Sequence, residues 1–232
     1  MAGRTYLLVP GAGGNGWIWH LVAERLRAGG HQAITVDLPG ADERAGLSGY
    51  AEVIVESAGK EGIDGDFGGE LVVVAHSMGG LSAPLAVDRL PVSRIVLVNA
   101  MIPAPGETGG DWWGNTGQEE ARRSADRAGG RDPDGPFDLG VYFFHDVPAD
   151  LAAYALAHDQ PQSETPFAMP WPLAAWPDVP TRVLAGADER FFPVEFQERV
   201  ARERLGLGVE RLPGGHLMPL SRPDELTKAL LS

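Results

Sequence analysis

The sequence predicts an α/β fold, a doubly wound, mostly parallel sheet of about six strands with an inserted helical segment. Two observations predict this fold class. Short apolar segments alternate with amphipathic segments along the 232 residues, which is the pattern of strands joined by helices. Residues 71–74 consist of one Leu and three Val, which is typical of a central strand covered on both faces.

The expected strands are short apolar runs, and each is followed by a turn or a helix signal. They cover residues 5–9, 33–36, 71–74, 94–99, 181–185 and 209–212. Helical patterns lie before Gly29 and at residues 50–58, 78–90, 193–205 and 224–231. Pro84 falls inside the third of these helices and should kink it, because proline cannot donate a backbone hydrogen bond.

The alternation breaks once, between residues 100 and 180. Pro, Gly and aromatic residues are concentrated there. A structureless loop of this length is uncommon inside a compact domain, so the segment should fold by itself as helices. We therefore predict that residues 1–100 and 180–232 form the α/β core and that residues 101–179 form an inserted cap.

Composition excludes several classes of protein. Hydrophobic residues make up 44% of the chain and charged residues 22%, as in a soluble globular protein, and no apolar run is long enough to cross a membrane. The net charge of −13 disfavours nucleic acid and anionic membranes as partners. The chain has no cysteine, which excludes disulfides, thiolate catalysis and cysteine-ligated metals. The N-terminus lacks the pattern of a secretory signal, so we expect a cytoplasmic protein.

A serine follows the most apolar strand directly. The residues Ala75-His76-Ser77-Met78-Gly79 are close to the G-x-S-x-G pattern, in which small residues let a strand and a helix pack tightly while the serine Oγ projects from the sheet. Ala75 replaces the first glycine of that pattern and adds one methyl group. An ordinary N-cap serine is the alternative interpretation.

A nucleophilic serine needs a base that accepts its proton and a carboxylate that orients the base. Asp188 follows the fifth expected strand and His216 follows the sixth, so both should emerge at the same edge of the sheet as Ser77. We therefore predict the triad Ser77, Asp188 and His216. Glu189 and Asp37 remain alternatives for the acid.

The other histidines and the aromatic residues have different expected places. The ring of His76 should pack within the elbow. His145 and His158 fall in the predicted cap, where we expect them at the surface, with a place in a pocket wall as the alternative. The cap aromatics should form mainly the core of the cap. Some of them should face Ser77 and make an apolar binding site.

Acyl transfer also needs amide donors for the oxyanion that develops on the substrate. The N–H of Met78, directly after the serine, and that of Ala12, in the loop after the first strand, are the expected donors. Gly11 and Gly13 allow this loop to approach the serine closely.

Residues 11–16 also match the dinucleotide-binding pattern G-x-G-x-x-G, with Asp37 about twenty residues later. This pattern would predict an NAD(P)-dependent oxidoreductase. However, Asp37 lies in an Asp-Leu-Pro-Gly turn, and Trp17 and Trp19 crowd the start of the helix where a pyrophosphate would sit. The Tyr and Lys four residues apart that short-chain reductases need are also missing. We expect neither a cofactor nor a metal.

Taken jointly, several motifs resemble the α/β-hydrolase superfamily over nearly the whole chain. They are Val9-Pro10-Gly11-Ala12-Gly13 with Trp17 and Trp19, Asp37-Leu38-Pro39-Gly40, His76-Ser77-Met78-Gly79-Gly80, Val179-Pro180-Thr181, Asp188 with Phe192-Pro193, and Gly214-Gly215-His216. The chain looks most like the small capped branch that contains plant methyl-ester esterases and hydroxynitrile lyases, with their bacterial relatives. Pro10 and Ala75 depart from the pattern of that branch, which has His and Gly there in many members.

The residues and the resemblance together predict a serine hydrolase. The expected activity is that of a carboxylesterase, acting through an acyl-enzyme on a small or medium ester with an apolar portion. A ligand-binding or receptor-type relative with negligible turnover is one alternative. A lyase of the hydroxynitrile lyase type is another, but the resemblance implies that such lyases carry Lys after the catalytic His and Thr in the first glycine loop. Leu217 and Gly11 stand there in this chain.

Overall fold

One parallel sheet organises the computed structural model, which describes residues 3–232. Over those residues the sheet has six strands in the order β2-β1-β3-β4-β5-β6. They are β1 (Thr5–Val9), β2 (Gln32–Thr35), β3 (Leu71–His76), β4 (Val92–Val98), β5 (Thr181–Gly186) and β6 (Glu210–Leu212). The predicted α/β fold class is confirmed.

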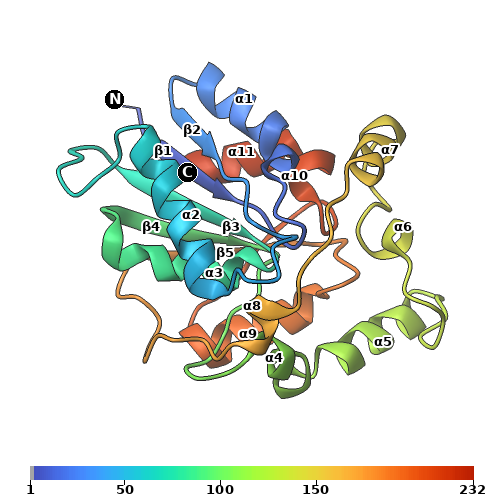
Figure 1. The fold of residues 1–232 in the computed structure, drawn as a ribbon. Coiled ribbons are helices and arrows are strands. Elements are labelled where there is room, and N and C mark those ends of the chain that lie inside the picture. The colour runs from blue at the N-terminus through green and yellow to red at the C-terminus, as the bar shows by residue number, and fades with distance from the viewer. Residues whose placement is uncertain (1–2) are drawn as a thin grey trace.

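Helices cover both faces of the sheet (Figure 1). The core helical elements are η1 (Gly16–Trp19), α1 (His20–Ala28), α2 (Leu47–Lys60), α3 (Gly79–Ser82), η2 (Ala83–Arg89), α9 (Val194–Leu205), α10 (Met218–Ser221) and α11 (Pro223–Leu231). α1 and α11 pack on one face, and α2, η2 and α9 pack on the other.

Alternation along the strands explains the two layers. Successive strand side chains point to opposite faces. Accordingly, Leu7 and Val73 are buried against α2 and α9, whereas Tyr6 and Val72 are buried against α1 and α11. β3 pairs with β1 on one side and β4 on the other, so the strand that ends at the predicted nucleophile is central and fully buried.

The helix after β3 is interrupted as the proline predicts. Four residues of α3 are followed by the 3₁₀ segment η2, and Pro84 stands at its start. The missing N–H of proline is tolerated there because the first turn of a helix has no internal partner for it.

The segment between β4 and β5 contains short helices, of which α4 to α7 form an arc from the bottom up the right of Figure 1, while α8 lies near the centre. They are α4 (Gly109–Thr116), α5 (Gln118–Ala128), α6 (Leu139–Tyr142), α7 (Ala149–Ala157) and α8 (Thr165–Ala168). The carboxylate of Glu107, at its entry, forms a largely buried ion pair with Arg204 of α9. Helices were expected between residues 101 and 179, and the division into a core domain and a cap domain stays a prediction.

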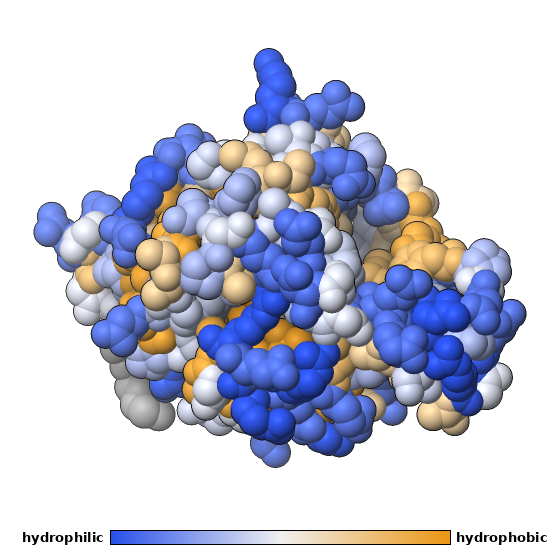
Figure 2. All heavy atoms as spheres, turned by 90° about the horizontal axis from the view of Figure 1, so that it is seen from below, coloured by the Kyte–Doolittle hydropathy of each residue, from blue (hydrophilic) through white to orange (hydrophobic). Residues whose placement is uncertain are grey.

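The surface seen from below is mostly hydrophilic, and apolar atoms show in recessed patches (Figure 2). Among the helices described over residues 3–232, none has both the length and the apolar character needed to cross a membrane.

Candidate active site

Ser77 stands at a strained turn between β3 and α3. Its φ is 51°, a left-handed conformation that costs energy for a non-glycine residue. The neighbouring glycines make the turn possible. A Cβ on Gly79 would lie 2.6 Å from the carbonyl oxygen of Pro10, and one on Gly80 would lie 1.9 Å from that of Met101. The sequence therefore builds the sharp strand-to-helix turn that was predicted at Ser77, and the role of the serine as nucleophile stays a prediction.

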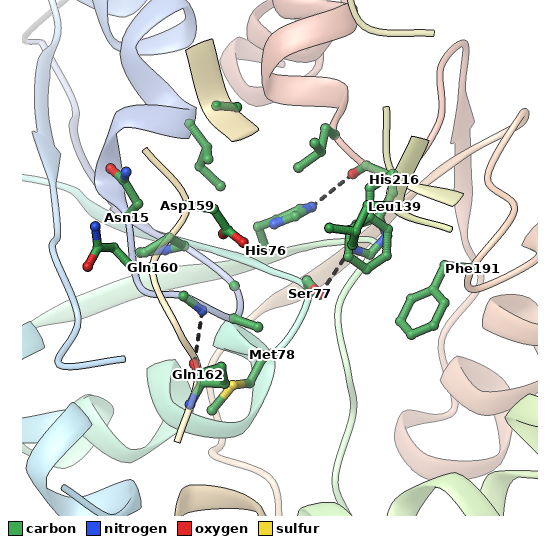
Figure 3. A pocket seen from close by; sticks show the side chains of 18 of the residues that line it. Asn15, His76, Ser77, Met78, Leu139, Asp159, Gln160, Gln162, Phe191 and His216 are labelled. Carbon is green, nitrogen blue, oxygen red and sulfur yellow. Dashed lines mark hydrogen bonds between the residues drawn. The ribbon is translucent and has the colours of Figure 1, made fainter. Parts of the chain in front are cut away.

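The imidazole of His216 lies beside the serine (Figure 3). Its Nε2 is 3.1 Å from Ser77 Oγ, and the residue is 2% exposed. Its ring stacks on Phe143 at a centroid distance of 4.4 Å and meets Phe191 edge-on at 5.6 Å. The loop after β6 and the rings of Phe143 and Phe191 thus hold the predicted base beside the predicted nucleophile.

Glu189, not Asp188, lies against His216. Oε2 of Glu189 is 2.7 Å from Nδ1 of His216, and Oε1 accepts hydrogen bonds from the N–H groups of Phe191 and Phe192. Asp188 is exposed, and its carboxylate accepts instead from the N–H of Gly214 at 3.2 Å. The expectation that Asp188 meets the histidine is wrong, and the alternative Glu189 takes that place.

The physical reason is the direction of two adjacent side chains. Both residues follow β5 at the expected edge of the sheet, but the loop turns there, because Glu189 N–H donates to Gly186. The turn directs the carboxylate of Glu189 toward His216 and that of Asp188 toward the backbone of Gly214. The sequence holds only a weak signal that Glu189 is buried, namely the apolar pair Phe191-Phe192 two residues later, whose N–H groups donate to its carboxylate.

The loop after β1 reaches the serine. A Cβ on Gly11 would lie 2.8 Å from Ser77 Cβ and 3.3 Å from its Oγ. Ala12 and Met78 both line the same pocket. Over residues 3–232 neither backbone N–H donates to a protein acceptor, so both donors are available to an oxyanion. Their role remains a proposal.

Asp37, which follows β2, has a structural place against the same loop. Its Oδ1 accepts a hydrogen bond from the N–H of Gly16 at 2.8 Å, which secures the glycine turn to the end of β2. Trp19 is fully buried, and Trp17 stacks on His20 at a centroid distance of 4.5 Å. These contacts account for Asp37 and the tryptophans without a dinucleotide.

The ring of His76 packs within the elbow, as expected, and is buried. Its Nε2 donates to the carbonyl oxygen of His216 at 2.8 Å, and its ring meets Trp19 edge-on. Burial, together with the nearby His216, lowers the pKa of His76 to about 3. The ring is therefore neutral at physiological pH and serves as a hydrogen-bond donor to the loop that carries the base.

A pocket of about 430 Å³ opens in front of Ser77 (Figure 3). Its apolar wall is made largely by aromatic and aliphatic side chains: Trp17, Ile18, Trp113, Phe137, Leu139, Phe143, Phe144, Leu156, Phe167, Phe191, Phe192, Leu217 and Leu220. One edge is polar and consists of Asn15, His158, Asp159, Gln160 and Gln162. The segment 101–179 contributes to both, as predicted for the aromatic residues. His158 is exposed, in keeping with the surface place expected for it, and it also lines the pocket.

The glycine loop is tied to this polar edge. The N–H of Gly13 donates to Oε1 of Gln162 at 2.9 Å, a contact drawn in Figure 3. Gln162 in turn donates to Tyr50 OH at 2.9 Å. The inserted segment therefore fixes the loop that approaches Ser77.

His145 lies outside the pocket and against the loop of His216. Burial, followed by the positive charge of Arg190, lowers its pKa. Among residues 3–232, no three His, Asp or Glu side chains gather in a group that could hold a metal ion. The expectation of no metal and no cofactor stays a prediction.

The arrangement is suited to proton transfer at a serine. Ser77 Oγ, the His216 imidazole and the Glu189 carboxylate form one hydrogen-bonded line, with contacts of 3.1 and 2.7 Å. Such a line lets imidazole accept the hydroxyl proton while the carboxylate fixes the tautomer and stabilises the imidazolium.

Plant esterases are similar to part of this chain. Probable esterase PIR7A of Oryza sativa subsp. indica is 34% identical over 114 residues, which cover 45% of this chain and 42% of that protein. Methylesterase 7 of Arabidopsis thaliana is 37% identical over 109 residues, with coverage of 43% and 41%. The matches span less than half the length of these curated relatives.

Solved structures resemble the whole fold. The crystal structure of polyneuridine aldehyde esterase gives a TM-score of 0.77 at 22% identity, covering 99% of this chain and 98% of that chain. An extracellular alpha/beta-hydrolase from a Paenibacillus species gives 0.76 at 18% identity, covering 98% of both chains. The model of the alpha/beta hydrolase family matches residues 6–229. The chain belongs to the alpha/beta hydrolase family.

Proposed function

We propose that this protein is a serine hydrolase, a carboxylesterase that acts through an acyl-enzyme. The observation that carries the proposal is the continuous hydrogen-bonded line from Ser77 through His216 to Glu189. Its location at the floor of an apolar pocket adds support. The similarity to proteins named esterase and methylesterase agrees with it.

In the first half-reaction, His216 Nε2 accepts the proton of Ser77 Oγ while Oγ attacks the carbonyl carbon of the ester. The carbonyl π electrons move to oxygen, and the N–H groups of Ala12 and Met78 stabilise that oxyanion. When the C–O bond to the alcohol breaks, the imidazolium returns the proton to the leaving oxygen. Glu189, with its side chain fully buried, stabilises the imidazolium between these steps.

The second half-reaction repeats the sequence with water. His216 takes a proton from the attacking water, the tetrahedral intermediate collapses, and Oγ regains a proton as the acid leaves. Ser77, which stands at the floor of the pocket with 9% exposure, can be reached by both ester and water through that pocket.

The pocket indicates the kind of ester. A volume of about 430 Å³ fits a small or medium substrate. Three apolar residues near the pocket are unusually exposed, namely Phe137 at 52%, Leu156 at 48% and Leu139 at 36%. We propose that the substrate carries an apolar portion that covers these side chains.

The first experiment measures release of p-nitrophenol from p-nitrophenyl butyrate, together with labelling by a fluorophosphonate probe. We expect a steady rate and labelling at Ser77, and loss of both in Ser77→Ala. Labelling that persists in Ser77→Ala would contradict the nucleophile. Labelling of the wild type without steady turnover would favour the ligand-binding alternative.

A second experiment separates hydrolysis from lyase chemistry by measuring cyanide release from mandelonitrile. Leu217 is 8% exposed and packs against Leu220, so the site lacks an ammonium beside the base to receive cyanide. A side chain at Gly11 would collide with Ser77. We expect no cyanide above background, and substantial release with inert esters would overturn the proposed function.

A further inference from the structure

Asn99 is an unusual residue directly after β4. It is fully buried, and its φ of 45° makes it one of two non-glycine residues with positive φ among residues 3–232, the other being Ser77. Such conformations cost energy and persist where the surrounding contacts hold them. Its N–H donates to the carbonyl oxygen of Leu184 at 3.0 Å.

The side-chain amide of Asn99 is fully used. Nδ2 donates to the carbonyl oxygens of Gly215 at 2.9 Å and His216 at 3.1 Å. Oδ1 accepts from the N–H of Gly186 at 2.9 Å and from Nε2 of Gln197 at 3.2 Å. One amide thus joins the ends of β4 and β5, helix α9 and the loop of the base.

The two donated bonds hold the peptide groups on both sides of His216. The N–H of Gly215 is held from the inserted segment by Asp146 Oδ2 at 2.8 Å, and the carbonyl of His216 also accepts from His76 at 2.8 Å. The imidazole itself must meet Ser77 on one side and Glu189 on the other. A shift of these peptide groups would misplace the imidazole relative to both partners.

We infer that Asn99 is a positioning residue for His216 and sets the distance between the base and the nucleophile through the carbonyls of Gly215 and His216. This inference rests on the proposed function. It does not make Asn99 a catalytic residue, because its amide acts only through the backbone of the loop.

The sharpest variant is Asn99→Gly, since glycine adopts positive φ freely and removes only the side chain. We expect kcat on p-nitrophenyl butyrate to fall about 100-fold, the scale of a 1 Å misplacement, while KM changes less than about threefold. Asn99→Asp is the second variant. It keeps the size and the Oδ1 acceptor but places an oxygen against the two carbonyls, so its kcat at neutral pH should fall at least as far.

A spectroscopic readout separates positioning from stability. The proton on His216 Nδ1, shared with Glu189, should give a low-field NMR resonance in the wild type that is absent in His216→Ala. In Asn99→Gly we expect that resonance to broaden or vanish and labelling of Ser77 to slow by a factor similar to the loss of kcat. Leu26→Ala is the control, because this buried residue lies at the end of α1 near the opposite edge of the sheet. It should lose stability and keep the resonance and kcat.

Retention of kcat, labelling rate and resonance in a folded Asn99→Gly variant would overturn the inference. A wild type that shows the resonance but hydrolyses no ester would overturn the proposed function instead. In that case the resonance of Asn99→Gly still decides whether Asn99 positions the imidazole.

Discussion

Oε2 of Glu189 lies 2.7 Å from Nδ1 of His216, and the carboxylate is fully buried. Its other oxygen accepts from the N–H groups of Phe191 and Phe192, so the charge is compensated on both sides. A buried carboxylate held this way cannot rotate without losing hydrogen bonds that water could not replace. The orientation of the imidazole therefore depends on Glu189 and on the loop that Asn99 holds.

Glu189→Gln should lower kcat by about 10³-fold or more, because an amide in place of the carboxylate favours the wrong tautomer of His216 and leaves the imidazolium without a counter-charge. Asp188→Asn is the matched control, one residue away and exposed. Its kcat should stay within about threefold of the wild type, because Asn retains the acceptor for Gly214. The measurement is kcat on p-nitrophenyl butyrate with the melting temperature of each variant. A crippled Asp188→Asn beside an active Glu189→Gln would reverse the assignment.

His216→Ala should cost about 10³-fold or more in turnover without unfolding the protein, as broken triads do. His145→Ala should cost less than about tenfold, because this ring lies against Gly215 and does not line the pocket. Single-turnover assays and circular dichroism would check both variants. If His145→Ala proved the more damaging, the base would have to be reassigned.

Gly11→Ala should reduce kcat by about 10-fold to 100-fold, because the new Cβ would displace Ser77 or the loop by several tenths of an ångström. The rate of fluorophosphonate labelling should fall with it. Gly59→Ala is the control. This glycine lies in α2 with nothing near its missing side chain, so activity should not change and stability should rise by up to about 1 kcal/mol. Full activity in Gly11→Ala would show that the loop does not need this close approach.

Among the residues described from 3 to 232, no Lys or Arg lines the pocket, and Asp159 is its one carboxylate there. An ester with a trimethylammonium group should therefore exceed its neutral tert-butyl isostere about fivefold in kcat/KM, as one charge pair in water allows. Asp159→Asn should remove this preference. Asp150→Asn, in the first turn of α7, should keep it. Equal rates for both esters in the wild type would contradict a role for the carboxylate.

Glu107 should make stability depend on acid pH. Burial alone would raise its pKa, but hydrogen bonds from Arg204 and Asn115 outweigh burial and lower it below 4.5. A carboxyl whose pKa is lower in the folded protein than in the unfolded chain stabilises the fold fully at pH values above the unfolded-state pKa. That contribution is lost as pH falls below about 4.5. Glu107→Gln should lower the free energy of unfolding at pH 7 by about 3 kcal/mol, and the difference from the wild type should shrink toward pH 3.

The exposed pair of Glu52 and Arg89 provides the control for that measurement. Glu52→Gln should change stability at pH 7 by less than about 1 kcal/mol. Urea unfolding at several pH values would measure both variants. A pH-independent difference for Glu107→Gln would show that the loss comes from packing and not from charge.

The sequence alone determined the sheet, the sharp turn at Ser77 and the edge of the sheet, at the carboxyl ends of the strands, where the site lies. The apolar strand at residues 71–74 and the glycines after Ser77 specify burial and close packing, which are local properties. His216 could be predicted because its loop follows the last strand, and parallel strands end at one edge.

Only the tertiary structure decided which of Asp188 and Glu189 contacts His216, and only it revealed the contacts of Asn99. Asp188 and Glu189 are adjacent in a tight turn, and their side chains point in opposite directions. A turn has no regular periodicity from which the sequence could tell which of the two side chains faces the core. The hydrogen bonds of Asn99 reach residues 87 and 117 positions away. Contacts at that range follow from how the sheet and the inserted segment pack, which the residue pattern by itself does not encode.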